Sequence, residues 1–184
     1  MQFSPTAVEG VVVVEIEPIL DERGFFARSW CPIEFANAGL HSTWVQENLA
    51  YNLYRGTLRG LHFQRAPHAE VKLVCCTRGA VWDVAVDLRP SSATFRRWLG
   101  IELSAENHRK LYIPEGCAHG YLTLTDDVEM RYLTSHAYEP SAASGVRYDD
   151  PLLDVRWPDE ILILSDNDRT WSPLESGLDA RLAK

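Results

Sequence analysis

The sequence predicts an all-β protein, built as an antiparallel sandwich or small barrel with a few short peripheral helices. Several short segments alternate between apolar and polar residues, with the period of two that is typical of a strand. Gly, Pro, Asp or Asn separates these segments, and helical patterns are rare. A chain of 184 residues suits one domain spanning residues 1–184. Because a small barrel commonly encloses one ligand, we expect the functional site inside it.

Five segments carry the strand signal. Residues 81–88 alternate most clearly, and residues 71–76 are rich in β-branched residues and lead into a turn at Arg78-Gly79. Residues 11–17 and 97–103 are further strand candidates. In residues 128–134, the face that we expect to point inward carries Val128, Met130, Tyr132 and Thr134.

Helix signals occur in two places. Residues 31–39 begin with an early proline, continue with an apolar stripe and close on a glycine, which predicts one short helix. Residues 173–183 form a second candidate at the C-terminus.

Composition narrows the functional class. The formal net charge is −8, which disfavours nucleic acid or an anionic membrane as the main partner, since both require a clustered basic face. The four cysteines form no Cys-x-x-Cys pair, so we expect reduced thiols. The sequence starts MQFSPTAVEG, without a basic leader or an apolar core, so we expect no signal peptide and a cytoplasmic protein.

The densest group of polar residues lies in residues 55–64, read as RGTLRGLHFQ. On a regular strand His62 and Gln64 share one face, while Arg59 points to the other. All three would reach one pocket only if the strand contained a bulge, and Gly60 is a suitable position for it. The alternative is a strand with unrelated polar groups on its solvent face.

Lys72 lies inside an apolar β-run with Val71, Leu73 and Val74. A lysine in this setting is either an outward-facing strand residue or a buried cation that serves an anionic group. On local sequence alone, the outward-facing arrangement is the commoner of the two.

A second histidine follows the turn IPEGCAHG at residues 113–120. Two histidine-bearing strands that face a common interior are typical of cupin barrels, many of which bind a metal. Here His62-Phe-Gln64 lacks the second histidine of the usual His-x-His motif. A two-histidine, one-carboxylate site of His62, Glu70 and His119 is an alternative, but we favour a metal-free site.

Taken together, these motifs resemble the dTDP-4-dehydrorhamnose 3,5-epimerase family over nearly the whole chain. The matching segments, in order, are DERGFF (21–26), QEN (46–48), GTLRGLHFQ (56–64), KLV (72–74), DVAVDLR (83–89), IPEGCAHG (113–120), Tyr132, YEP (138–140) and SDND (165–168). The resemblance implies a cupin fold and an isomerase that inverts C3, C5 or both in a nucleotide-linked 4-keto-6-deoxyhexose, as a step of deoxysugar biosynthesis.

The resemblance also implies roles for individual residues. His62 matches the family's base, Asp168 its carboxylate partner, Lys72 the cation beside the C4 oxygen, and Tyr132 the acid on the opposite sugar face. The positions matched to substrate binding are Arg23, Phe26, Arg28, Gln46, Asn48, Arg59, His119 and Tyr138. Neither a cofactor nor a metal is implied. A homodimer is implied, with residues 23–26 reaching the partner's pocket.

Three positions depart from the family pattern: Arg28 replaces an acid, Ala143 a glutamate and Asn167 a lysine. We therefore expect altered ligand recognition rather than lost chemistry. One hypothesis is a CDP-linked substrate, because an arginine at position 28 would suit the acceptor N3 of cytosine; the alternative is that Arg28 points to solvent. The same residues are also compatible with a single-centre epimerase, a non-catalytic sugar-nucleotide-binding cupin or a metal-dependent cupin.

Overall fold

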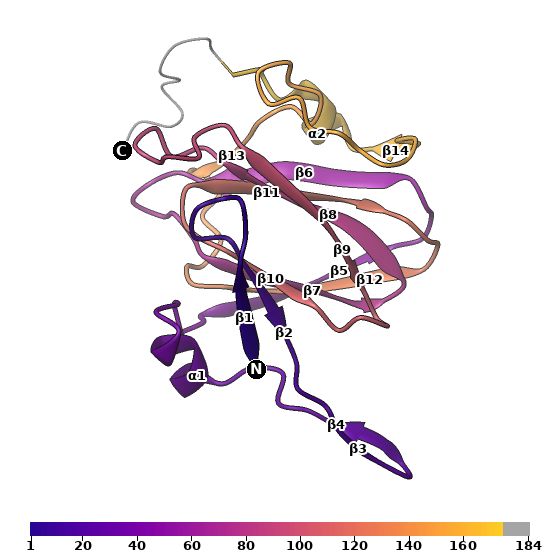
Figure 1. The fold of residues 1–184 in the computed structure, drawn as a ribbon. Helices are drawn as coiled ribbons and strands as arrows, with labels where there is room; N and C mark the ends of the chain where they lie inside the picture. Colours follow the sequence, from indigo (N-terminus) through magenta and orange to yellow (C-terminus); the bar gives the residue numbers. More distant parts are fainter. Residues whose placement is uncertain (175–184) are drawn as a thin grey trace.

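The computed structural model describes residues 1–174, most of which form two antiparallel sheets that face each other (Figure 1). The first sheet has the strand order β1 (Gln2–Pro5), β2 (Val12–Glu15), β10 (Lys110–Ile113), β7 (Lys72–Arg78), β12 (Val128–Thr134) and β5 (Gln46–Asn52). The second has the order β13 (Ala143–Gly145), β6 (Thr57–Gln64), β11 (Cys117–Thr123), β8 (Ala80–Asp87) and β9 (Trp98–Ser104), and β14 (Ile163–Leu164) pairs in parallel with β6. This architecture confirms the predicted all-β barrel.

The five predicted strands correspond to β2, β7, β8, β9 and β12, with ends that differ by a few residues. The inward face expected for β12 is also correct, since Val128, Met130 and Thr134 are buried. Strand β8 is buried on both faces: Val84 and Val86 pack in an outer cluster, and the opposite face points into the barrel. The acidic residues on that inward face therefore lie in the interior.

Helix α1 (Pro32–Asn37) matches the prediction for residues 31–39. Pro32 occupies the first helical position, where a missing N–H costs nothing, and Gly39 has the positive φ that favours glycine just after a helix. Helix α2 (Asp166–Thr170) was not predicted, because a single turn leaves no periodic pattern. The helix predicted over residues 173–183 falls, beyond residue 174, outside the described residues.

The space between the sheets is filled by an apolar core over part of its length. This core draws on both sheets, with Val74, Leu111 and Met130 from the first and Val81, Ala85 and Leu103 from the second. Tyr121 and Tyr132 pack against it and also line a cavity. The core thus leaves room for a pocket between the sheets, as expected for a small barrel.

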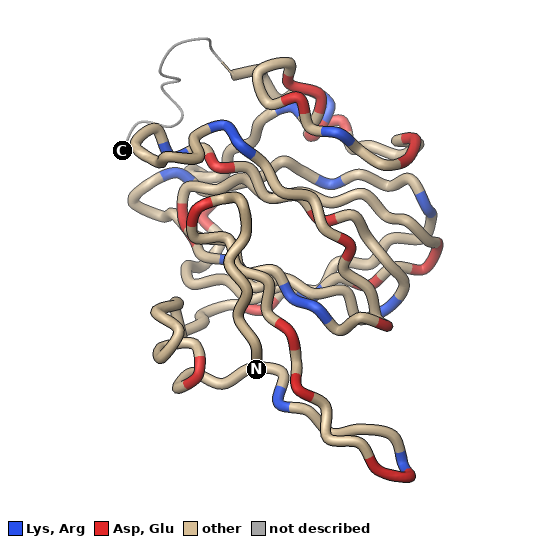
Figure 2. Tube along the Cα trace, viewed as in Figure 1, with Lys and Arg blue, Asp and Glu red and all other residues tan. Residues whose placement is uncertain are grey.

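Strands β3 (Ile19–Asp21) and β4 (Gly24–Phe26) form a hairpin that projects away from the barrel (Figure 1). Its apolar residues are solvent-exposed in the single chain, among them Leu20 and Phe26. Figure 2 shows charged residues clustered at its tip, and elsewhere basic residues interleaved with acidic ones. Among the described residues, no helix is long and apolar enough to cross a membrane.

Candidate active site

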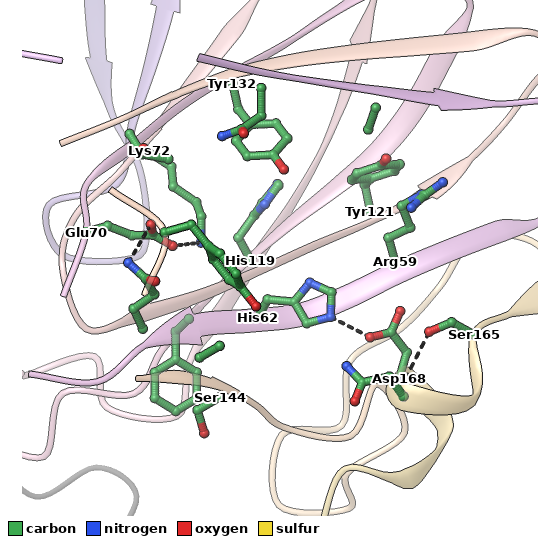
Figure 3. Close-up of a pocket in the computed structure, with 18 of the residues that line it drawn as sticks. Arg59, His62, Glu70, Lys72, His119, Tyr121, Tyr132, Ser144, Ser165 and Asp168 are labelled. Atoms are coloured by element: carbon green, nitrogen blue, oxygen red, sulfur yellow. Dashed lines mark hydrogen bonds and ion pairs between the residues drawn. The ribbon is translucent and has the colours of Figure 1, made fainter. Parts of the chain in front are cut away.

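A cavity of about 860 Å³ lies between the two sheets, lined by side chains from both (Figure 3). Strands β5, β7 and β12 of the first sheet contribute Gln46, Asn48, Lys72 and Tyr132. Strands β6 and β11 of the second sheet contribute Arg59, His62, Gln64 and His119. A ligand in this cavity would therefore be held between polar groups from two separate sheets.

A bulge in β6 brings Arg59, His62 and Gln64 to this one cavity. The pairing with β11 sets His119 opposite His62 but Tyr121 opposite Arg59, so β6 holds one residue more between the two pairs. The extra residue reverses the alternation of side chains, as a bulge does. Gly60 sits at this point with a φ of 129°, and a Cβ there would lie 2.4 Å from Gly120 Cα. The predicted bulge at Gly60 is confirmed.

His62 and Asp168 form a histidine–carboxylate pair, in which His62 Nε2 contacts Asp168 Oδ1. Asp168 is buried on α2, where its N–H donates to the Ser165 side chain that caps the helix. Burial alone would raise the pKa of Asp168, but hydrogen bonds, chiefly from His62, hold it below its usual value. Asp168 thus stays ionised and fixes the orientation of the imidazole, leaving Nδ1 as the ring nitrogen not bonded to the carboxylate.

Lys72 is buried in the cavity wall, with 7% of its surface exposed. Its Nζ lies 2.6 Å from Glu70 Oε1 in an ion pair whose two side chains are 9% and 10% exposed. The outward-facing arrangement, which is commoner for a lysine in a strand, does not occur here. Lys72 is an interior cation with one carboxylate partner.

Tyr132 and His119 complete the wall around Lys72 and His62. Tyr132 is half-buried, and burial, followed by the nearby Glu70 carboxylate, raises the pKa of its phenol. His119 Nε2 lies 2.9 Å from Oδ2 of Asp83, a fully buried residue on the inward face of β8. This second histidine–carboxylate pair fixes the orientation of the His119 ring.

Arg59 is held in place by a polar contact below the cavity surface. Its Nε donates to Asn52 Oδ1 over 2.7 Å, and Asn52 Nδ2 lies 3.3 Å from the Tyr121 hydroxyl. Burial raises the pKa of Tyr121 to about 12, so this phenol stays protonated. At the cavity mouth, Gln46 donates to Asn48 and accepts from the backbone N–H of Tyr138.

Three predicted binding residues lie outside the cavity of their own chain. Arg23 pairs with Asp21 at the hairpin tip, and Phe26 is 73% exposed on β4. Arg28 follows the hairpin and donates to Glu34 on α1 over 2.7 Å. Arg28 thus lies outside the cavity of its own chain, and its side chain is 65% exposed, in agreement with the alternative that it points to solvent. The other two departures from the family pattern, Ala143 and Asn167, both line the cavity.

The alternative metal set of His62, Glu70 and His119 is not assembled. His62 is paired with Asp168, Glu70 with Lys72 and His119 with Asp83. Among residues 1–174, no three His, Cys, Asp or Glu side chains are grouped so that they could hold a metal ion.

Sequence reasoning missed four residues that hold the predicted ones in position: Asp83, Asn52, Tyr121 and Glu70 in its role as the partner of Lys72. Asp83 carried a usable signal, since an acid in the middle of an otherwise apolar strand requires a partner. Asn52 ends β5 in a polar segment and gave no comparable signal.

Comparison with known proteins places these features in a family. A family model described as dTDP-4-dehydrorhamnose 3,5-epimerase matches residues 5–176. A protein of that name from Methanothermobacter thermautotrophicus is 43% identical over 176 residues, covering 94% of each chain. A dTDP-4-dehydrorhamnose 3-epimerase from Streptomyces niveus is 37% identical, covering 99% of this chain and 88% of the relative.

Solved structures agree in fold. The Bacillus anthracis dTDP-4-dehydrorhamnose 3,5-epimerase, with TDP and PPi bound, superposes with a TM-score of 0.91 at 39% identity, covering 94% of this chain and 99% of the other. A 3'-monoepimerase from Streptomyces bikiniensis in complex with dTDP-quinovose gives 0.85 at 35% identity, covering 92% and 86%. The predicted cupin jelly roll and the predicted enzyme class, an isomerase, are confirmed. The chain belongs to the dTDP-4-dehydrorhamnose 3,5-epimerase family.

Proposed function

We propose that this protein epimerises C3 and C5 of a nucleotide-linked 4-keto-6-deoxyhexose, as a step of deoxysugar biosynthesis. The observation that carries the proposal is the placement of His62 and Tyr132 on facing sheets around one cavity, with the Lys72 ammonium in its wall. Inversion requires that a proton leave one face of the sugar and that another arrive on the opposite face. A base and an acid that approach from two sheets meet this requirement.

In the proposed reaction, His62 takes the proton through Nδ1, because Nε2 is bonded to Asp168. The C–H bond breaks, and its electron pair delocalises into the neighbouring C4 carbonyl to give an enolate. The ionised Asp168 stabilises the imidazolium that forms. This pair also sets which ring nitrogen can act as the base.

Lys72 is the group suited to the negative charge that develops on the C4 oxygen, because a preorganised cation in a buried site stabilises an oxyanion strongly. Tyr132 then gives its phenolic proton to the opposite face of the carbanion and inverts the centre. Its raised pKa keeps the phenol protonated until that step. Proton exchange with solvent then returns His62 to its neutral form and Tyr132 to its phenol form, so both groups can act on the second centre.

We propose a dTDP-linked substrate. Arg59 is suited to the diphosphate, since guanidinium groups bind phosphate oxygens through paired hydrogen bonds. Gln46, Asn48, His119 and Tyr138 surround the rest of the cavity and would contact the sugar and the base. The bound TDP of the Bacillus anthracis relative supports this assignment. The CDP hypothesis depended on Arg28, and the guanidinium of this residue is paired with Glu34.

We also propose a cytoplasmic homodimer. The exposed apolar residues of the β3–β4 hairpin support dimerisation, because a second chain could cover them and receive Arg23 and Phe26 at its pocket. All four cysteines lie in the described part of the chain as free thiols, which suits a reducing compartment.

Mass spectrometry in D₂O tests the reaction. With dTDP-4-keto-6-deoxyglucose, we expect the wild-type enzyme to incorporate two deuterons, one at C3 and one at C5, and Tyr132→Phe to lose the inversion. The single-centre relatives make a one-centre enzyme the second candidate, for which one deuteron would be incorporated. Absence of any deuterium would contradict both.

Calorimetric titration with dTDP, CDP and GDP tests which nucleotide base the enzyme prefers. Tighter binding of CDP would refute the dTDP assignment.

A further inference from the structure

Glu70 is the one carboxylate that contacts Lys72 among the described residues. It lies two residues before Lys72, next to the start of β7, and it is almost as buried as the lysine. Figure 3 shows the pair on one side of the cavity and Arg59 on the other. The contact therefore lies at the end of the pocket away from the proposed diphosphate subsite.

A second donor fixes the other oxygen of this carboxylate. Gln64 Nε2 lies 3.1 Å from Glu70 Oε2, and its two hydrogens are shared between this oxygen and the carbonyl oxygens of His68 and Ala137. Gln64 Oε1 accepts from the N–H of Glu139 over 2.6 Å, so the amide cannot be turned round without losing these bonds. Each Glu70 oxygen thus faces its own donor.

We propose that Glu70 is a positioning residue of this site, whose carboxylate holds the Lys72 ammonium at the cavity wall that Lys72 shares with Tyr132. The inference rests on the proposed roles of these two residues. A buried charge requires a partner, because taking it out of water without one is costly. The Glu70 carboxylate at 2.6 Å is that partner for the Lys72 ammonium.

The same charge acts on Tyr132. After burial, Glu70 is the main cause of the raised pKa of this phenol, and Arg59 acts in the opposite direction. The other titratable groups that line the cavity are His62, His119, Tyr121, Tyr138 and Asp168. One carboxylate therefore contacts the proposed cation, Lys72, and favours the protonated form of the proposed acid, Tyr132.

Glutamine at position 70 would not replace glutamate. An amide offers one acceptor oxygen, whereas Gln64 and Lys72 present two donors at this place. If that oxygen accepts from Lys72, the NH₂ group of the new side chain faces Gln64 Nε2, so two donors oppose each other and the ammonium loses its counter-charge. Aspartate keeps the charge but is shorter by one methylene, so it would draw Lys72 away from its position.

The test compares pH profiles of kcat/KM for the wild-type enzyme, Glu70→Gln and Glu70→Asp. Loss of the Glu70 charge removes one of the causes that raise the pKa of Tyr132, so for Glu70→Gln we expect the alkaline limb to move to lower pH by about one unit or more. For Glu70→Asp, we expect a smaller shift of the limb and a kcat lower by about tenfold or more, since misplacing a catalytic group is costly. Glu129→Gln, on β12 but outside the cavity wall, is the matched control.

Identical alkaline limbs for wild-type and Glu70→Gln enzyme would overturn the role of the charge. A wild-type kcat in Glu70→Asp would overturn the positioning role, and this variant decides the matter if Glu70→Gln does not fold. Affinity for dTDP should be unchanged in both variants, because Arg59 lies across the cavity; a loss of affinity would mean a general structural defect and would count against the proposal. A wild-type enzyme that incorporates no deuterium would instead refute the proposed function itself.

Discussion

At the scale of single residues, the site consists of reactive side chains that are each held by a second polar residue. Asp168 holds His62, Glu70 holds Lys72, Asp83 holds His119 and Asn52 holds Arg59. Such second contacts restrict the rotamers of the reactive side chains and hold each one in a productive geometry. The consequence is that the holding residues should matter almost as much as the residues that touch the substrate.

The His62–Asp168 pair gives a direct test of this view. Replacing Asp168 with asparagine keeps its shape but removes the charge that supports a protonated imidazole, so we expect kcat to fall by about 10²- to 10⁴-fold. Substrate affinity should change little, because Asp168 contacts His62 rather than the diphosphate subsite. Steady-state kinetics measures both quantities. Asp166→Asn, an exposed acid in the first turn of the same helix, is the control and should retain wild-type kcat; equal rates for both variants would contradict the assignment.

The residues that touch the cavity could be named from the sequence, but most of those that hold them could not. Arg59, His62 and Gln64 stand close together and matched known motifs, and Lys72 stood out as a charge in an apolar run. The contact between Asp168 and His62 joins residues far apart in the chain, and only the family resemblance paired them. Asn52 and Arg59 lie on consecutive strands that belong to different sheets, β5 and β6, so strand alternation within one sheet does not predict their contact.

At the scale of elements, the deciding feature is the bulge of β6 at Gly60. Strand alternation alone would direct Arg59 away from His62, and the extra residue brings both to the cavity. Elements with clear alternation, such as β8 and β12, were predictable, whereas β13 and β14 were not, because two or three residues carry no period. Those short strands form only because β6 already offers a free edge.

Gly60→Ala tests the bulge. Its new Cβ would lie 2.4 Å from Gly120 Cα and 2.9 Å from the His119 carbonyl oxygen, at a φ that alanine rarely adopts. Overpacking and backbone strain together should lower the free energy of unfolding by roughly 2–6 kcal/mol. Urea unfolding measures this change. Gly24→Ala is the control, because Gly24 has a similar φ of 126° but nothing within 4 Å of its Cβ, so it reports strain alone; equal losses in the two variants would show that close packing at Gly60 is unimportant.

At the scale of the whole molecule, two facing sheets explain how one small pocket can act on both faces of a sugar. The second sheet supplies His62 and Arg59, and the first supplies Lys72 and Tyr132. Strand alternation predicted which side of β12 points inward, but not which strands lie across the barrel from it. That information resides in the strand order of the two sheets, which the structure shows; the resemblance implied only a cupin fold.

A single chain offers no structural explanation for the projecting hairpin of β3 and β4. Its apolar residues are exposed, and Arg23, matched to substrate binding, is 85% exposed and does not line the cavity of its own chain. The hairpin itself projects away from the barrel in Figure 1. If each hairpin completes the pocket of a second chain, Arg23→Ala and His62→Asn damage the same pocket from different chains. A heterodimer of the two variants would then contain one intact pocket and one pocket with both changes.

Mixing the two variants therefore tests whether the hairpin serves the pocket of its own chain or the pocket of a second chain. Each variant alone should be nearly inactive; after unfolding and refolding together in equal amounts, half of the dimers are mixed, so about a quarter of the wild-type activity should return. Refolding each variant separately and mixing afterwards is the control and should restore nothing if exchange is slow. If Arg23 served its own chain's pocket, each mixed dimer would hold two singly damaged pockets, and no activity would return. Activity in the co-refolded sample thus requires that the hairpin act across the dimer, because no other pairing of these two changes leaves a pocket intact.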